Sequence, residues 1–161
     1  MTPNNPSTLL ALSAGIQSEI AAYVFYLEAI KKVNNQELEE ILTKLAYEEK
    51  AHFHTLERQH HNRIKSEKWI SIADVMKRDG LPEIEEDMAA DHQELINLVR
   101  DTSSIREVLD IAYKLEEDSH IMFSHEAERA DNEETKKIFA DLARFEKGHM
   151  GVVQDMIKKF A

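Results

Sequence analysis

The sequence predicts an all-α protein, a four-helix bundle in which two helical hairpins are joined by one long crossover. Apolar residues recur at spacings of three and four almost throughout the chain, which is the period of an amphipathic helix. Only 4 glycines and 3 prolines are present, too few for the turns of a many-stranded β fold. Two short polar breaks, Asn34-Asn35 and Asp131-Asn132, each separate two long helical stretches. We expect residues 1–161 to form a single domain, because domains usually contain about 100–200 residues.

The first hairpin is expected from the two helical stretches at the start of the chain. Ser7 and Thr8 are candidate N-caps for a helix that runs to about Val33. Asn34-Asn35 ends this helix, and a second helix with unbroken apolar phase follows over about residues 36–64. Helices of this length extend for about 40 Å, so two such hairpins can enclose a continuous core without a sheet.

The crossover is expected over about residues 65–104 and has a less regular pattern. It contains the clearest helix breaker in the chain, Asp79-Gly80-Leu81-Pro82. A shorter amphipathic stretch, over about residues 83–99, follows this breaker. A connection of this length between two tight hairpins is typical of bundles with one long crossover.

The second hairpin begins after a serine cap, for which Ser103 and Ser104 are both candidates. The third long helix is expected over about residues 105–130, and Asp131-Asn132 ends it. A fourth helix then runs over about residues 133–160. The two predicted hairpins therefore occupy about residues 7–64 and 105–160.

Charge and composition exclude several classes of function. With 20 Lys and Arg against 31 Asp and Glu, the net charge of −11 argues against nucleic acid and anionic membranes as partners. The absence of cysteine excludes disulfides, thiolate metal sites and a cysteine nucleophile. The first seven residues do not resemble a signal peptide, and the longest uninterrupted apolar run, Ile20–Leu27, is too short to span a bilayer. We therefore expect a cytoplasmic protein that is not bound to a membrane.

The two hairpins resemble copies of each other at a shift of 97 residues. The segment Leu45–His52 matches Leu142–His149 at Leu-Ala, Glu-Lys and the final His, and Glu19 falls on Glu116. The same shift places Glu48 opposite Phe145. The matched set includes Glu and His at positions where the helix should be apolar, so the repeat identifies these residues as candidates for a functional site.

Helix phase shows which acidic residues face the core. At 100° per residue, each of the four long helices carries one carboxylate in the middle of its apolar stripe. A histidine lies one turn further on in the second and fourth helices, as a Glu-x-x-His pair. The six residues are Glu19, Glu49, His52, Glu116, Glu146 and His149. The other two Glu-x-x-His pairs, Glu57/His60 and Glu117/His120, have no counterpart in the repeat.

Each of these residues, taken alone, could be a solvated charge or a core histidine satisfied by a neighbouring glutamate. The set cannot be explained in this way, because burying unpaired charges costs many kcal/mol and no Lys or Arg lies on the stripes near the mid-core. Two divalent cations would balance four carboxylates. The pattern therefore predicts a two-metal site in which each ion has one terminal Glu, one His and a share of the bridging carboxylates.

These motifs resemble the ferritin-like di-iron carboxylate proteins and, among them, the rubrerythrin family. The resemblance covers nearly the whole chain and is carried by four segments: Glu19 with Tyr26, Glu49–His52, Glu116–Phe123 and Glu146–His149. It implies two iron ions per chain, held by the six residues above, in a non-haem centre that reacts with hydrogen peroxide or dioxygen. It also implies that Tyr26 hydrogen-bonds a ligand carboxylate.

The chain departs from the family pattern at three places. Rubrerythrins usually carry a second iron domain with four cysteines, so here the electrons are expected from an external redox protein. Ser119 stands where the family has an extra glutamate, which makes the ligand set symmetric and similar to that of bacterioferritin. Phe123 replaces a tyrosine of the family. His120, inside the core stripe, is a candidate hydrogen-bond donor to a ligand carboxylate, a seventh ligand or a residue at the rim.

Three functions remain open from the sequence. The first is a peroxidase or oxidase that uses an external electron donor. For this function we expect the chain to form a homodimer. The second is ferritin-like iron oxidation and storage, which requires a closed cage. The third is metal binding without turnover, with zinc or manganese in place of iron, because oxygen and nitrogen ligands alone do not distinguish these metals.

Overall fold

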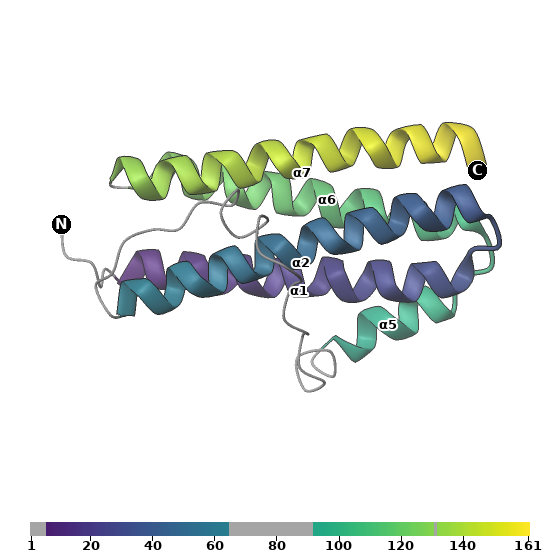
Figure 1. Ribbon diagram of the computed structural model, residues 1–161, viewed down its shortest axis with the longest axis horizontal. Coiled ribbons are helices and arrows are strands. Elements are labelled where there is room, and N and C mark those ends of the chain that lie inside the picture. The colour runs from purple at the N-terminus through teal and green to yellow at the C-terminus, as the bar shows by residue number, and fades with distance from the viewer. Residues whose placement is uncertain (1–5, 65–91, 131) are drawn as a thin grey trace.

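The computed structural model describes residues 6–64, 92–130 and 132–161. All regular secondary structure in these residues is helical, as predicted: α1 (Pro6–Lys32), α2 (Gln36–Ile64), α5 (Gln93–Arg100), α6 (Ile105–Arg129) and α7 (Glu133–Phe160). Figure 1 shows α1 beside α2 and α6 beside α7, with α5 lying along α1. The bundle of two hairpins that the sequence predicts is therefore confirmed.

Three of the four long helices begin at a side-chain cap. Asn35 Oδ1 accepts a hydrogen bond from the Leu38 N–H at 3.0 Å, ahead of α2. Ser104 is the N-cap of α6, so of the two candidates Ser103 and Ser104 the structure selects Ser104. Asn132 caps α7 in the same way as Asn35 caps α2.

The start of α1 differs from the expectation. The helix begins at Pro6, so Ser7 and Thr8 lie inside it, and the prediction that one of them is the N-cap is wrong. Proline is tolerated in the first turn because the N–H that it lacks would have no partner within the helix. The cap pattern misled because a serine or threonine near a helix start is also common within the first turn.

The crossover is described only at its end. Helix α5 corresponds to the last part of the amphipathic stretch expected over residues 83–99, while the breaker at 79–82 lies outside the described residues. Arg100 binds the buried Glu28 of α1, with Nε 3.3 Å from a carboxylate oxygen. Ile96 and Val99 are buried. An ion pair and an apolar face therefore hold α5 against the first hairpin.

The apolar core is divided along the bundle axis. One cluster of buried residues lies near the hairpin turn of α1 and α2 and includes Phe25, Leu42 and Leu109. Another, nearer the opposite end, includes Leu12 and Phe139. The predicted metal ligands fall between these clusters on all four long helices. The core therefore isolates a polar layer in the middle of the bundle.

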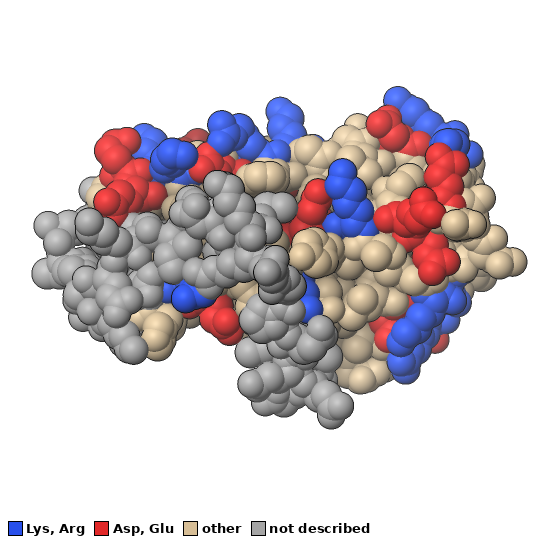
Figure 2. All heavy atoms as spheres, viewed as in Figure 1, with Lys and Arg blue, Asp and Glu red and all other residues tan. Residues whose placement is uncertain are grey.

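Helix α1 is apolar enough to be considered as a membrane span. Its segment Thr8–Lys32 is long enough to span a membrane and contains an 18-residue stretch with a mean hydropathy of 1.3, but half of that stretch is buried inside the bundle. The core helix of a bundle passes the same test. On the molecular face in Figure 2, acidic and basic side chains lie next to each other. Pairs one turn apart, such as Arg106 with Asp110 at 2.9 Å, show the same intermixing.

Candidate metal centre

The six residues that the repeat and the helix phase select come together in the middle of the bundle. Glu19 comes from α1, Glu49 and His52 from α2, Glu116 from α6, and Glu146 and His149 from α7. They form two groups, and within each group the potential ligand atoms lie within 4.8 Å of one another. The groups are Glu19, Glu49, His52 and Glu146, and Glu49, Glu116, Glu146 and His149.

Glu49 and Glu146 belong to both groups. Each group is completed by one further carboxylate and one histidine, which we call position 1 (Glu19 and His52) and position 2 (Glu116 and His149). A Glu-x-x-His pair on one helix spans one turn, so its two side chains lie on the same face. The pairs of α2 and α7 thus supply a shared carboxylate and a histidine each.

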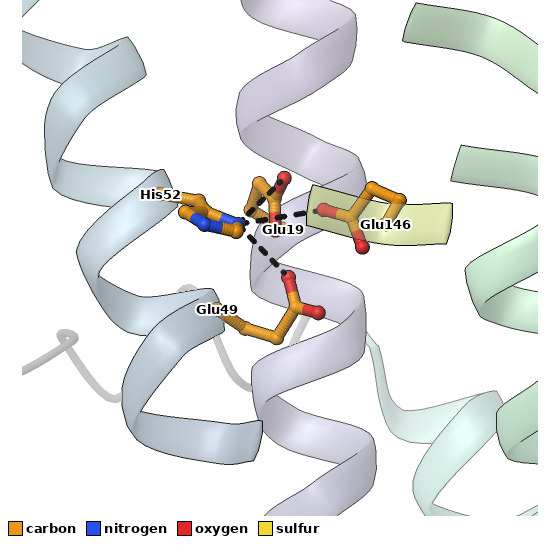
Figure 3. Close-up of side chains that lie close together, drawn as sticks. All are labelled: Glu19, Glu49, His52 and Glu146. Atoms are coloured by element: carbon orange, nitrogen blue, oxygen red, sulfur yellow. Dashed lines mark ion pairs between the residues drawn. The ribbon is translucent and has the colours of Figure 1, made fainter. Parts of the chain in front are cut away.

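Position 1 is arranged around the ring of His52. Its Nδ1 atom lies 3.4 Å from Glu146, 3.7 Å from Glu19 and 3.7 Å from Glu49. Figure 3 shows the three carboxylates pointing from separate helices toward this nitrogen. All four side chains are at least 99% buried. Three oxygens and one nitrogen around a common point form a ligand set suited to a divalent metal.

Position 2 has the same arrangement around His149. Its Nδ1 atom lies 2.7 Å from Glu49, 3.4 Å from Glu116 and 3.5 Å from Glu146. The opposite ring nitrogen, Nε2, lies 2.8 Å from Glu48 Oε2. An ionised carboxylate can only accept a hydrogen bond, so Nε2 donates to Glu48, while Nδ1 is hydrogen-bonded to Glu49 within the cluster. A hydrogen bond of this kind commonly orients a metal-binding histidine.

The cluster leaves many buried polar atoms without hydrogen-bond partners. Within residues 6–64, 92–130 and 132–161, both carboxylate oxygens of Glu19 and Glu146 lack a partner, as do both ring nitrogens of His52 and one oxygen each of Glu49 and Glu116. Buried polar groups in folded proteins are almost always paired, and each unpaired one costs about 1–3 kcal/mol. Metal ions would coordinate these atoms, so the residues present fit the two-metal site that the sequence predicts.

The carboxylates of the cluster divide into two kinds. Burial, followed by the charges of Glu146 and Glu49, holds the pKa of Glu19 well above its usual value. Burial and the neighbouring Glu146 raise the pKa of Glu116 to about 7. Burial also acts on Glu146, but its contacts with Glu116 and the two histidines outweigh burial and lower its pKa to about 2. The pKa of Glu49 is lowered as well, against the effect of burial.

The histidines respond to the shared carboxylates. Burial lowers the pKa of His52, but Glu146 and Glu49 have the larger combined effect and raise it to about 9. The pKa of His149 is raised by its carboxylate neighbours, again against burial. Burial and charge therefore favour the protonated form of the histidines and the ionised form of the shared glutamates, so opposite charges lie side by side in the cluster.

Tyr26 lies where the sequence predicts. Its hydroxyl donates a hydrogen bond to Glu116 Oε1 at 2.6 Å, and both side chains are 1% exposed. Ser119 is buried, and its hydroxyl lies 2.6 Å from the hydroxyl of Ser18 on α1. His120 belongs to neither ligand group, and its Nδ1 atom lies 2.8 Å from the Ala143 carbonyl oxygen of α7.

Glu48 is the residue of the site that sequence reasoning missed. It is adjacent to Glu49 on α2 and therefore lies about 100° away from it around the helix, off the core stripe. Helix phase alone therefore could not identify Glu48 as a residue of the site. The repeat offered the one available signal, because Glu48 of the first hairpin corresponds to Phe145 of the second.

The two unrepeated Glu-x-x-His pairs lie outside the cluster. The Glu57 side chain is 48% exposed and near His54, and the Glu117 side chain is 39% exposed and near Lys114. Neither pair belongs to a ligand group among the described residues. The repeat therefore distinguishes the clustered pairs from the others.

Comparison with known proteins agrees with this arrangement. A hypothetical protein from Pyrococcus furiosus has the same fold, with a TM-score of 0.65 and 23% sequence identity over 98% of this chain and 91% of that chain. No curated protein sequence matches this chain. The family profile described as rubrerythrin matches residues 11–157, a span that contains all six clustered residues. This chain belongs to the rubrerythrin family.

Proposed function

We propose that this protein is a non-haem di-iron oxidoreductase that reduces hydrogen peroxide or dioxygen with electrons from an external redox protein. The observation that carries the proposal is the sharing of Glu49 and Glu146 between two buried ligand groups. Shared carboxylates hold two metal ions close enough to act on one small substrate, about 3.5–4 Å apart. A pair of iron ions supplies two electrons to an O–O bond.

The residues of the chain support this chemistry in three ways. Glu49 and Glu146 would bridge the ions, while positions 1 and 2 each add one terminal carboxylate and one imidazole. Carboxylates and imidazoles suit iron in both of its common oxidation states. The apolar clusters on either side exclude bulk water from the layer. Reduction of hydrogen peroxide to two waters consumes two electrons and two protons. The external redox protein must therefore return two electrons to the site after every turnover.

Two partly exposed side chains, one on α2 and one on α7, contact the histidines of the site. Phe145 is 41% exposed and packs on the His52 ring, with centroids 5.0 Å apart. The side chain of Glu48 is 25% exposed and contacts His149. Each of these side chains therefore connects a buried histidine of the site to the surface. We place the approach of the small oxidant, and the electron donor, on this side of the bundle.

Two measurements test the proposal. Protein purified without added metal is analysed for iron, zinc and manganese, and we expect about two iron ions per chain. The anaerobically reduced protein is then mixed with hydrogen peroxide or dioxygen in a stopped-flow instrument, and oxidation of the iron is followed in the visible spectrum. The double variant Glu49→Ala/Glu146→Ala should lose both iron and reactivity. Glu117→Ala, which removes an exposed glutamate near Lys114, is the matched control and should keep both.

The other functions predict different outcomes. Iron storage would give a large closed particle with a mineral core, which size-exclusion chromatography and electron microscopy would detect. A metal-binding role without turnover would give bound zinc or manganese, or iron inert to both oxidants. Retention of two iron ions in the double variant would reject the site itself.

A further inference from the structure

The surroundings of the two metal positions are not equivalent, although the positions are related by the internal repeat. Position 2 has two polar supports, Tyr26 on Glu116 and Glu48 on His149. The repeat places Phe123 at the counterpart of Tyr26 and Phe145 at the counterpart of Glu48. Both replacements by phenylalanine fall on the side of position 1.

The supports of position 2 act directly on its two terminal ligands. The Tyr26 hydroxyl holds one oxygen of Glu116 at 2.6 Å, and the other oxygen, without a partner, is left for a metal. The Glu48 carboxylate takes the Nε2 proton of His149 at 2.8 Å. Each terminal ligand of position 2 thus has a hydrogen bond from outside the ligand group that orients it.

The ligands of position 1 have no such supports among the described residues. Both oxygens of Glu19 and both nitrogens of His52 are buried without a hydrogen-bond partner in this part of the chain. The Phe145 ring packs on the His52 ring and offers no lone pair to its Nε2–H. The Phe123 ring approaches α1 at Gly15, one turn before Glu19, and has no hydroxyl to donate. A metal at position 1 must therefore orient both terminal ligands itself.

We infer that the two positions load in sequence: position 2 binds a metal first and more tightly, and position 1 binds second and releases its ion more readily. Glu48 and Tyr26 are positioning residues for the first ion. Loss of one outer hydrogen bond to a metal ligand typically lowers metal affinity 10–100-fold, so the two positions should differ by at least tenfold. This inference rests on the proposed two-metal site but not on its redox chemistry.

The direct test uses Co²⁺ alone, which needs no turnover. Crystals of the metal-free protein grown with one equivalent of Co²⁺ per chain should show the anomalous signal at position 2. Calorimetric titration should give two steps whose dissociation constants differ by at least tenfold. Equal occupancy of the positions, a single step for two ions, or the first ion at position 1 would overturn the inference.

Reciprocal variants identify the cause of the asymmetry. Glu48→Leu removes the acceptor and should weaken the tight step 10–100-fold, while Glu48→Gln keeps an acceptor oxygen and should restore part of the affinity. Phe145→Glu gives His52 the acceptor that it lacks and should tighten the weak step. Phe145→Leu is its matched control and should not tighten the weak step. Failure of Phe145→Glu and Glu48→Leu to move either step would reject the assigned role of these side chains.

The outcomes separate this inference from the proposed function. Two equal Co²⁺ sites in a protein whose reduced iron form reacts with peroxide would overturn the inference and leave the function standing. Sequential sites in a protein inert to both oxidants would support the inference and reject the function. Absence of Co²⁺ binding at both positions would overturn the inference and remove the basis of the proposed function.

Discussion

The Tyr26 hydroxyl of α1 donates a 2.6 Å hydrogen bond to Glu116 of α6, and so joins the first hairpin to the second inside the polar layer. Both side chains are buried, and the contact spans 90 residues of sequence. The bond fixes the carboxylate and also contributes to the docking of the two hairpins. Its removal should therefore be visible in stability as well as in metal binding.

Tyr26→Phe is expected to destabilise the metal-free protein by about 1–3 kcal/mol. The variant keeps the ring but leaves a buried carboxylate oxygen without its donor. Urea unfolding in the presence of a chelator measures the change. Tyr47→Phe removes a hydroxyl from a tyrosine that is 47% exposed and should have little effect. Equal stability of the two variants would show that the buried hydrogen bond contributes nothing.

The metal-free protein should lose stability as the pH rises from about 5 to 9. The pKa of Glu116 is raised from 4.5 to about 7, chiefly by burial. The pKa of His52 is raised from 6.5 to about 9 by its carboxylate neighbours, against burial. A raised pKa means that the folded state holds the proton more tightly, so the stabilisation is complete below the unfolded pKa and is lost through the folded one.

Thermal unfolding with a chelator at pH 5, 7 and 9 measures this dependence. We expect the midpoint to fall by at least roughly 5 °C across the range. His52→Gln should flatten the decline between pH 6.5 and 9, whereas His125→Gln, at an exposed position, should not. A midpoint that rises with pH would contradict the charge distribution described for the cluster.

Metal loading should release protons. Four groups of the cluster have a raised pKa: Glu19, Glu116, His52 and His149. Ligands must lose their protons to bind a metal, so two ions should displace protons at pH 6, and fewer above pH 7, where Glu116 ionises. Calorimetry of Co²⁺ binding in buffers of different ionisation enthalpy counts them. Release of fewer than about one proton would show that the cluster is already ionised.

Ser119→Glu should raise the ratio of the peroxide rate to the dioxygen rate by about tenfold, or ~1.4 kcal/mol in the barrier. The added carboxylate would supply the charge that this position has in other members of the family. Because the Ser119 hydroxyl lies 2.6 Å from Ser18, the companion change Ser18→Gly gives the longer side chain room. Ser119→Gln with Ser18→Gly is the uncharged control. A ratio that does not differ between these two variants would show that the charge is irrelevant.

Gly15→Ala and Gly151→Ala should change stability in opposite directions. A Cβ at Gly15 would lie 3.0 Å from side-chain carbons of both Leu56 and Phe123, and such overpacking costs about 1–3 kcal/mol. A Cβ at Gly151 meets no atom within 4 Å, so that variant should gain up to about 1 kcal/mol of helix propensity. Urea unfolding compares the variants. Stabilisation by Gly15→Ala would show that α6 and α2 adjust to the methyl group.

The sequence predicts the helices and the clustering of the six side chains because both depend on periodicity. A carboxylate in an apolar stripe has a defined direction once the helix phase is known, and the repeat identifies which of them recur. Glu48 could not be selected in this way, since it points to the edge of the stripe and reaches His149 only by the packing of α2 against α7. The contact of Ser119 with Ser18 likewise depends on how closely α6 approaches α1.

Other properties of the protein do not follow from helical periodicity. The identity of the metal follows from no distance in the cluster, because iron, zinc and manganese accept the same donors. The external electron donor and the homodimer remain predictions, as does the cytoplasmic location. The breaker at 79–82 lies outside the described residues. These properties depend on surfaces and conditions that a helical pattern does not encode.

The sharing of Glu49 and Glu146 has a consequence for the order of folding. Each hairpin joins neighbours in sequence and can form from local contacts, which are made rapidly. Neither hairpin alone contains a complete ligand group, because position 1 requires Glu146 and position 2 requires Glu49. The metal-binding geometry therefore arises only when the hairpins dock, after the local steps. A metal ion bound at that stage would stabilise the docked hairpins and slow their separation during unfolding.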